Sequence, residues 1–232
     1  MPLFMVTFIK GLKVMHQPIL SPPCTIYLVR HGETDNNKNK ILQGDKVDMS
    51  LNKTGVQQAN QAAQRLKQVK FDMAFSSDLI RAKKTADIIA LQHKLTVTTH
   101  QALRERSFGQ FEGKPETEMR RKLKRVLDEF ESLSDEAKFN YQFPNGIENF
   151  ESCVTRLINF LRQISIAYSG KTVLVVTHGS IMRFLLIRLG FAAHDQLPIY
   201  PVYAIANLGH LVLESDGLDL IIKDTYGITV NK

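Results

Sequence analysis

The sequence predicts an α/β protein with three layers (α/β/α), a mostly parallel sheet, an antiparallel edge strand and a helical insertion. A motif of one strand followed by His-Gly occurs twice, as TIYLVRHG from residue 25 and as TVLVVTHG from residue 172. An apolar run rich in Val and Ile is typical of a strand buried on both faces of a parallel sheet. Segments with strand and helix patterns also alternate along the chain, which favours the α/β class.

The elements after the first strand follow in α-β-α-β order. A helix over residues 55–69 is expected to be capped by Thr54, and residues 71–76 form a short strand. Asp78 is expected to open a second helix over residues 78–90. A further strand lies near residues 94–99, before the irregular segment LRERSFGQFEG.

The second half of the chain is rich in helix patterns. A strongly charged helix is expected from Pro115 to about Leu133, with apolar residues at helical spacing. A PNG break at Pro144 precedes a long amphipathic helix, and the second His-Gly leads into a helix over residues 180–190. The chain ends in two strands joined by an Asp-Gly turn at residues 216–217.

Residues 1–24 differ from the rest of the chain, because they contain lysines but no acid and end near a Pro-Pro break. They lack the arginine and serine richness of a transit peptide and the cleavage site of a secretory signal. We interpret them as a flexible N-terminal extension. Residues 25–232 are then expected to form a single domain, with the helical insertion at about 114–143.

The charge balance predicts an affinity for anions. Lys and Arg number 30 against 23 Asp and Glu, an excess that is too mild to indicate nucleic acid and that suits phosphorylated metabolites. Two cysteines, Cys24 and Cys153, provide neither a disulfide framework nor a metal cluster, so a reducing compartment is expected. No apolar run approaches a membrane span. We expect a cytoplasmic protein, with nuclear or mitochondrial targeting as alternatives.

Several familiar catalytic devices do not fit. Cys24 and Arg30 have the spacing of a cysteine phosphatase loop, but an apolar strand would separate them by about 20 Å. The segment GQFEGK is one residue short of a Walker loop and follows no apolar strand. The G-x-S-x-G elbow of hydrolases is absent. The histidines show no metal-ligand spacing, so neither a metal nor a cofactor is expected.

The remaining candidates are cationic and polar. His31 and His178 end two strands of one predicted sheet, and ligands bind outside the carboxyl ends of such strands, so both side chains are expected to face one pocket. Arg30 precedes His31, and Arg81 lies in the first turn of a helix that follows a strand directly. A helix N-terminus attracts anions, and an arginine fork matches phosphate oxygens.

These residues carry a resemblance. The motifs RHGETDNN, SSDLIRAKKTA, LRERSFG and VVTHGS, in this order, resemble the histidine phosphatase superfamily, also called the phosphoglycerate mutase-like family. The resemblance spans about residues 25–207. It implies that the catalytic residues are His31, the nucleophile that accepts the phosphate, Glu105, the general acid, and His178, which also belongs to the phosphate pocket. The resemblance implies that the remaining site residues hold substrate phosphate or line its pocket: Arg30, Asn37, Gly44, Arg81, Arg106 and Gly179.

This assignment agrees with elementary chemistry. A neutral imidazole is a competent nucleophile near pH 7, and neighbouring cations favour the neutral form. Attack on phosphorus gives a phosphohistidine, and the charge of the transition state is stabilised by fixed cations without a metal. One carboxyl group can protonate the leaving alkoxide and then activate water.

The pattern QG…D…L…TG, after the first motif, resembles the TIGAR-type fructose-2,6-bisphosphatase branch. The resemblance therefore implies a phosphoric monoester hydrolase, a metal-independent phosphatase whose partner is a small phosphate ester. The best candidate for that ester is a sugar bisphosphate such as fructose 2,6-bisphosphate. The alternatives are a phosphoglycerate mutase and a catalytically weak interaction protein on the same fold.

Two residues depart from the pattern of the branch: Phe108 stands in place of a frequent tyrosine, and the acid after Pro144 is displaced to Glu148. Both departures leave the substrate specificity open. The oligomeric state is also left open by the sequence.

Five cations lie in the segment RRKLKR, at residues 120–125 of the charged helix. A solvated face is one interpretation, and a nuclear-targeting or anion-binding patch is another. A third is contact with the non-reacting phosphate of a bisphosphate, which would help to orient the reacting phosphate. On that third interpretation, charge reversals here raise KM for a bisphosphate more than for a monophosphate.

Overall fold

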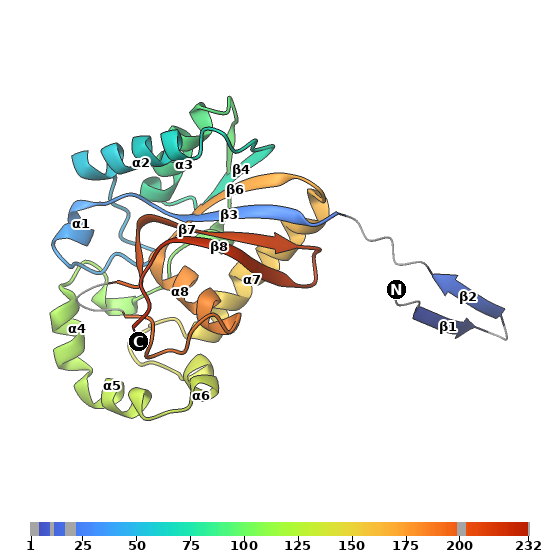
Figure 1. Cartoon of the computed structure of the whole chain (residues 1–232). Coiled ribbons are helices and arrows are strands. Elements are labelled where there is room, and N and C mark those ends of the chain that lie inside the picture. Colours follow the sequence, from blue (N-terminus) through green and yellow to red (C-terminus); the bar gives the residue numbers. More distant parts are fainter. Residues whose placement is uncertain (1–4, 10–11, 17–21, 199–202, 232) are drawn as a thin grey trace.

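A six-stranded sheet forms the centre of the molecule (Figure 1). The structure is a computed structural model that describes residues 5–9, 12–16, 22–198 and 203–231. The strands in spatial order are β5 (Val97–Thr99), β4 (Met73–Ser76), β6 (Thr172–Thr177), β3 (Cys24–Arg30), β7 (Ile205–Ser215) and β8 (Leu220–Ile228). The first four are mutually parallel, whereas β7 is antiparallel to both β3 and β8. The predicted fold class is confirmed, with an antiparallel hairpin at the edge.

Helices cover both faces of the sheet, which gives the three layers (Figure 1). On one face, α2 (Lys53–Arg65) and α3 (Ile80–Leu91) enclose a core that includes Val29 of β3. On the other face, α7 (Phe150–Ala167) and α8 (Gly179–Arg188) pack over Ile26 and Leu28 of the same strand. Alternate residues of β3 therefore enter two separate cores, as expected for a strand buried on both faces.

Two helices begin elsewhere than predicted. The N-cap of α2 is Asn52, whose side chain accepts a hydrogen bond from the Gly55 N–H at 2.8 Å, and Thr54 lies inside the helix. The helix α3 begins at Ile80, because the carboxylate of Asp78 is bound by the Arg104 guanidinium at 2.7 and 2.8 Å. Asn52 therefore caps α2 in place of Thr54. Asp78 does not cap α3, because its carboxylate is bound by Arg104.

The charged segment is not one continuous helix as predicted. It forms α4 (Glu116–Lys122) and α5 (Lys124–Glu131), which meet at Leu123, and α6 (Asp135–Asn140) follows. Leu123 is buried and lies outside helical geometry, at φ −103° and ψ 18°. Its side chain packs with Phe111 and Ile147, and the chain bends around this small core. The three helices lie within the segment predicted to be the insertion.

The boundary of the N-terminal extension also differs from the expectation. Cys24 is the first residue of β3 and is fully buried, and the Pro22 carbonyl accepts a hydrogen bond from the Gly170 N–H at 2.8 Å. The domain therefore begins near residue 22. Upstream, β1 (Met5–Ile9) and β2 (Leu12–His16) pair in a two-stranded sheet of their own (Figure 1). The flexibility of this segment stays a prediction.

The edge hairpin turns at Asp216 and Gly217, as the Asp-Gly motif predicts. The Asp216 carboxylate accepts the N–H groups of Leu218 and Asp219, both at 2.9 Å, and Gly217 adopts φ +97°, which favours glycine.

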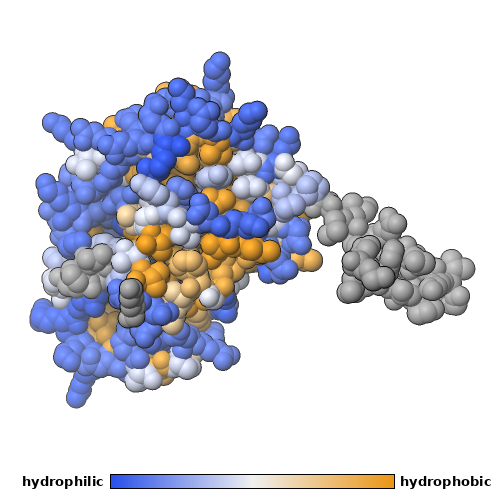
Figure 2. Space-filling model, in the orientation of Figure 1, coloured by the Kyte–Doolittle hydropathy of each residue, from blue (hydrophilic) through white to orange (hydrophobic). Residues whose placement is uncertain are grey.

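Hydrophobic residues gather over the β7–β8 hairpin on the face shown in Figure 2. Within the described ranges, no helix has the length and apolarity that a membrane crossing requires.

Candidate active site

The two His-Gly motifs meet at one edge of the sheet. The strands β3 and β6 are parallel neighbours in the register Arg30↔Thr177, so the next residues, His31 and His178, leave the sheet side by side. Their rings lie edge to face, with centroids 5.0 Å apart, and both side chains are buried. The fold thus brings together two residues that are 147 positions apart in the sequence (178 − 31).

His31 is held in one orientation. Its Nδ1 lies 2.7 Å from the carbonyl oxygen of Gly32, a contact that requires a proton on Nδ1 and leaves the lone pair on Nε2. Burial and the nearby guanidinium groups of Arg81 and Arg30 hold the pKa of His31 well below its ordinary value of 6.5. The ring is therefore neutral and nucleophilic at neutral pH.

Gly32 permits this arrangement because the start of α2 approaches it closely. A Cβ on Gly32 would lie 2.6 Å from the carbonyl oxygen of Gly55. Because that oxygen belongs to the main chain of α2, relief of the clash would require a shift of the helix. The N–H of Gly32 donates to the Thr85 hydroxyl at 3.0 Å, and that hydroxyl donates to the Arg81 carbonyl at 2.8 Å. The loop that carries His31 is thereby connected to α3.

Arg30 and Arg81 are buried cations beside His31. The Nη1 of Arg30 donates to the Ile205 carbonyl, and its guanidinium lies 5.6 Å from the centre of the Tyr203 ring. Burial lowers the pKa of both arginines, although Glu105 opposes the shift in each case. The Nε atoms of both arginines have no acceptor among the described residues. Uncompensated buried donors of this kind are expected where an anion binds.

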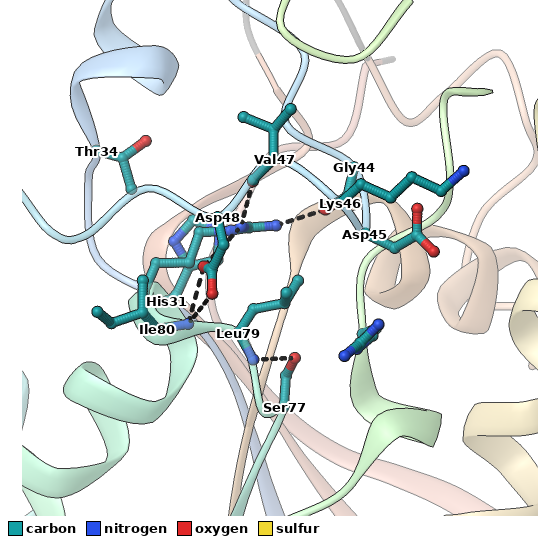
Figure 3. A network of polar contacts seen from close by, with 12 residues as sticks. His31, Thr34, Gly44, Asp45, Lys46, Val47, Asp48, Ser77, Leu79 and Ile80 are labelled. Atoms are coloured by element: carbon teal, nitrogen blue, oxygen red, sulfur yellow. Dashed lines mark hydrogen bonds and ion pairs between the residues drawn. The ribbon is translucent and has the colours of Figure 1, made fainter. Parts of the chain in front are cut away.

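The loop at residues 44–48 lies beside Leu79 and Ile80 at the start of α3 (Figure 3), and it binds Arg81. The carbonyl oxygens of Gly44 and Val47 accept hydrogen bonds from Arg81 at 2.7 and 3.1 Å. The Asp48 carboxylate accepts the Ile80 N–H at 2.9 and 3.0 Å, which provides the cap that α3 lacks in its own sequence. Gly44 also lines the cavity described below, so its expected contact with substrate stays a prediction, and its carbonyl positions Arg81.

Glu105 lies at the N-terminus of α8. Its carboxylate accepts the N–H groups of Arg106, Ser180 and Ile181 at 2.8, 3.1 and 3.2 Å. Two of these groups belong to the first turn of α8 and would otherwise lack a partner. Glu105 and the two histidines thus come together at the junction of β6 and α8.

His178 and Gly179 form that junction. His178 is the N-cap of α8, and neither of its ring nitrogens has a hydrogen-bond partner among the described residues. Burial and the charges of Arg81, His31 and two further arginines hold the pKa of His178 well below 6.5. A Cβ on Gly179 would meet the Arg30 Nε at 3.2 Å, so glycine leaves room for that guanidinium.

Asn37 and Arg106 also face the cavity described below. The Oδ1 of Asn37 is engaged in a capping box with Thr34 at 3.1 Å, which leaves the amide nitrogen for a ligand. Arg106 is buried, donates from Nε to the Glu148 carbonyl at 2.8 Å and lies 4.6 Å from the centre of the Phe150 ring. Burial lowers the pKa of Arg106 to about 10.

Three residues that organise the site were not predicted from the sequence: Asn207, Tyr203 and Glu112. The Asn207 amide donates to the His31 carbonyl at 2.9 Å, and the Tyr203 hydroxyl donates to the Glu116 carboxylate at 2.9 Å. The Glu112 carboxylate accepts N–H groups of Lys46, Val47 and Phe108 at 2.9 to 3.2 Å and so joins two loops. Glu112 stands within the quoted motif segment, whereas no local pattern marks the other two.

Most of the predicted site residues line a cavity of about 410 Å³, whereas His178, although in ring contact with His31, is not among its described lining residues. Its described lining includes His31, Arg30, Arg81 and Glu105 at one end and residues of α4 and α5 beyond them. Of the five cations at residues 120–125, Arg120 and Lys124 line the cavity, and the other three are not among the described lining residues. The helices α4 and α5 therefore line the pocket, as contact with a non-reacting phosphate would require. Only two of their five cations at residues 120–125 are placed to make such a contact.

Within the part of the chain that the structure describes, no three His, Cys, Asp or Glu side chains cluster in a way that suits a metal ion. Both cysteines are buried and unpaired. Cys24 and Arg30 stand at opposite ends of β3, and burial raises the pKa of the Cys24 thiol to about 11. Neither the geometry nor the acidity of Cys24 suits a thiolate nucleophile.

The family model of the histidine phosphatase superfamily (branch 1) matches residues 26–221 of this chain. The chain belongs to that superfamily, and the expectation of a phosphoric monoester hydrolase is confirmed. It is 35% identical over 164 residues to the uncharacterized phosphatase PhoE of Bacillus subtilis, covering 71% of this chain and 76% of that protein. It is 37% identical over 162 residues to phosphoglycerate mutase-like protein 4 of Arabidopsis thaliana, covering 69% and 68%.

The TIGAR resemblance is likewise confirmed. The chain is 36% identical over 149 residues to fructose-2,6-bisphosphatase TIGAR of Xenopus laevis, covering 62% of this chain and 51% of that protein. The chain thus spans about half the length of that relative. Among solved structures, a phosphoglycerate mutase from Bacillus anthracis superposes with a TM-score of 0.76 at 26% identity, covering 90% of this chain and 95% of the other.

Proposed function

We propose that this protein is a metal-independent phosphatase that hydrolyses a small phosphate monoester through a phosphohistidine on His31. One observation carries the proposal: the 2.7 Å contact between His31 Nδ1 and the Gly32 carbonyl, which leaves the Nε2 lone pair for attack on phosphorus. The buried guanidinium groups beside it provide the field that an incoming phosphate requires.

In the first step, His31 Nε2 attacks phosphorus in line with the ester oxygen. The P–N bond forms, the P–O bond breaks, and the leaving alkoxide takes a proton from Glu105. Arg30 and Arg81 stabilise the equatorial oxygens, and the neutral His178 ring donates one hydrogen bond to them. These cations do the work for which other phosphatases use a metal ion.

In the second step, water attacks the phosphohistidine. Glu105, now ionised, takes a proton from that water as the P–O bond forms and the P–N bond breaks. Inorganic phosphate leaves, and both His31 and Glu105 return to their starting states. The position of Glu105 at the start of α8, bound by three N–H groups, supports this role because it fixes one carboxyl group for both proton transfers.

The finer identity of the substrate is a second question. A sugar bisphosphate such as fructose 2,6-bisphosphate is favoured by the similarity to the TIGAR-type fructose-2,6-bisphosphatases. The lining of the cavity favours it less, because the two cations that α4 and α5 contribute are already paired with acids. The geometry therefore favours a small monophosphate as the substrate, and a sugar bisphosphate is the alternative.

The test is a phosphate-release panel with fructose 2,6-bisphosphate, fructose 6-phosphate, phosphoglycerates and a phosphopeptide. We expect release from a small ester, no release by the His31→Ala variant and full activity in saturating EDTA. Interconversion of 2- and 3-phosphoglycerate faster than hydrolysis would identify a mutase instead. A well-folded protein that releases phosphate from none of these compounds would support an interaction protein.

A further inference from the structure

The active-site cavity continues from the reactive end into a region with an apolar wall. Met119, Leu123 and Leu127 recur at intervals of four residues along α4 and α5, and all three line the cavity. Leu123 is buried and the other two are half-buried. Further apolar side chains line the described cavity from other segments: Ile41, Leu42, Phe108, Phe143, Ile147 and Phe184.

The two cations along this wall are already paired with carboxylates. The Arg120 guanidinium binds the Glu116 carboxylate at 2.9 and 3.0 Å, and the Lys124 ammonium binds the Asp128 carboxylate at 2.7 Å. All four of these residues line the cavity, together with the further acid Glu131. On α4 and α5, the cavity-lining acids thus outnumber the cavity-lining cations by three to two.

A second phosphate would bind poorly against such a wall. It would approach three carboxylates and would have to compete with one of them for its cation, which is the partly buried Arg120–Glu116 pair or the exposed Lys124–Asp128 pair. An apolar group, in contrast, would gain contact area on Met119 and Leu127 without breaking any of these pairs. Phe108, which also lines the cavity, offers no hydroxyl to a sugar.

We propose that the substrate is a phosphate monoester whose alcohol carries an apolar group of several carbons, which packs against Met119, Leu123 and Leu127. This inference rests on the proposed function, because the phosphate end of the cavity sets the position of the ester. The apolar wall and the reactive histidine belong to one continuous cavity.

Arg106 is the residue on which the alternative, a substrate with a second anionic group, depends. Its Nη2 has no acceptor among the described residues, although the side chain is buried and lines the cavity. The guanidinium lies 4.6 Å from the centre of the Phe150 ring and 4.8 Å from that of Phe143. This environment compensates the charge in part through cation–π contacts. If the compensation is insufficient, Arg106 binds a second anionic group of the substrate.

The first experiment measures binding and needs no turnover. Dissociation constants of ethyl-, butyl- and hexylphosphonate are determined by calorimetry, with inorganic phosphate as the competitor. We expect the affinity to rise about fourfold per added methylene, the effect of burying that group. Equal affinities across the series would overturn the proposal.

The second experiment compares kcat/KM for ethyl and hexyl phosphate, whose leaving groups have similar basicity. The double variant Met119→Gln/Leu127→Gln should lower the hexyl-to-ethyl ratio at least fivefold. Leu91→Gln makes the matched change at a residue that is 74% exposed and lies on α3, and it should leave the ratio unchanged. An equal ratio in wild type and double variant, with both proteins folded by circular dichroism, would contradict the apolar subsite.

Two further outcomes separate this inference from the proposed function. Chain-length-dependent phosphonate binding without phosphate release from any ester would leave the apolar subsite in place and refute the phosphatase. A kcat/KM for fructose 2,6-bisphosphate above that for hexyl phosphate, lost selectively in Arg106→Gln, would refute the apolar substrate and establish the second anion site.

Discussion

The imidazole of His31 meets that of His178 edge to face, with ring centroids 5.0 Å apart and both rings buried. Two imidazolium cations at this separation, beside Arg30 and Arg81, would repel each other strongly. Burial and the neighbouring guanidinium groups accordingly hold the pKa of both histidines well below 6.5. The pair is therefore neutral at pH 7, as a nucleophile and a hydrogen-bond donor must be.

This pair predicts an unusual titration. Because the pKa of each histidine is lowered in the folded state, both rings stay neutral as the pH falls from 8 through 6.5, and protons bind only well below that value. Imidazole resonances of His31 and His178, assigned through single His→Asn variants, should not shift between pH 8 and pH 6.5. The urea-unfolded chain is the control, since its histidines titrate near 6.5. A folded-state midpoint at or above 6.5 for His31 would contradict this electrostatic account.

The role of Glu105 predicts a dependence on the leaving group. Glu105→Gln should lower kcat for an alkyl phosphate by about 100-fold or more, because an alkoxide requires a proton when it leaves. The first step with p-nitrophenyl phosphate needs no such proton, so single-turnover formation of the phosphoenzyme should slow much less. Rapid-quench kinetics on both esters provide the measurement. Equal losses for the two would assign Glu105 a structural role at α8 instead.

Arg81 is predicted to act through its planar fork. Arg81→Lys keeps the charge but cannot both bind the Gly44 and Val47 carbonyls and face a phosphate, so kcat/KM should fall about 10- to 100-fold. Lys83→Ala, two residues along α3, removes only an exposed pair with Asp87 and should change kcat/KM by less than twofold. Comparable losses in both variants would indicate damage to α3 rather than to the phosphate site.

The position of Pro22 suggests where the N-terminal segment should be cut. Removal of residues 1–21 is expected to leave kcat and Tm nearly unchanged, because Pro22 is the first of the described residues with a hydrogen bond to the rest of the domain. Removal through Cys24 should lower Tm by several degrees, since it deletes a fully buried strand residue. Thermal denaturation of both truncated proteins distinguishes the two boundaries. A large loss of stability in the shorter truncation would show that residues 1–21 belong to the folded domain.

Much of the site was predictable because its chemistry lies in local motifs. Two strands that end in His-Gly were enough to place His31 and His178 at one sheet edge, since parallel strands align their carboxyl ends. Residues that act across long sequence separations were not predictable. Asn207 reaches the His31 carbonyl, and Asp48 caps a helix 32 residues away, with no periodic pattern at either position.

The helix boundaries failed for a related reason. Thr54 and Asp78 are good capping residues by type, but Asn52 precedes Thr54 and Arg104 binds Asp78 more strongly than a helix terminus would. The break at Leu123 also depends on tertiary packing, because a small core around Phe111 forms only in the folded chain. Helical periodicity alone continues through that position.

The most direct test of the central claim is the identity of the phosphorylated residue. The protein is quenched with denaturant within milliseconds of mixing with a ³²P-labelled substrate, digested and mapped by mass spectrometry. The proposed mechanism predicts an acid-labile, base-stable phosphate on His31, absent from His31→Ala and formed equally in EDTA. Phosphate on a cysteine or an aspartate, or a phosphoenzyme that requires magnesium, would contradict it.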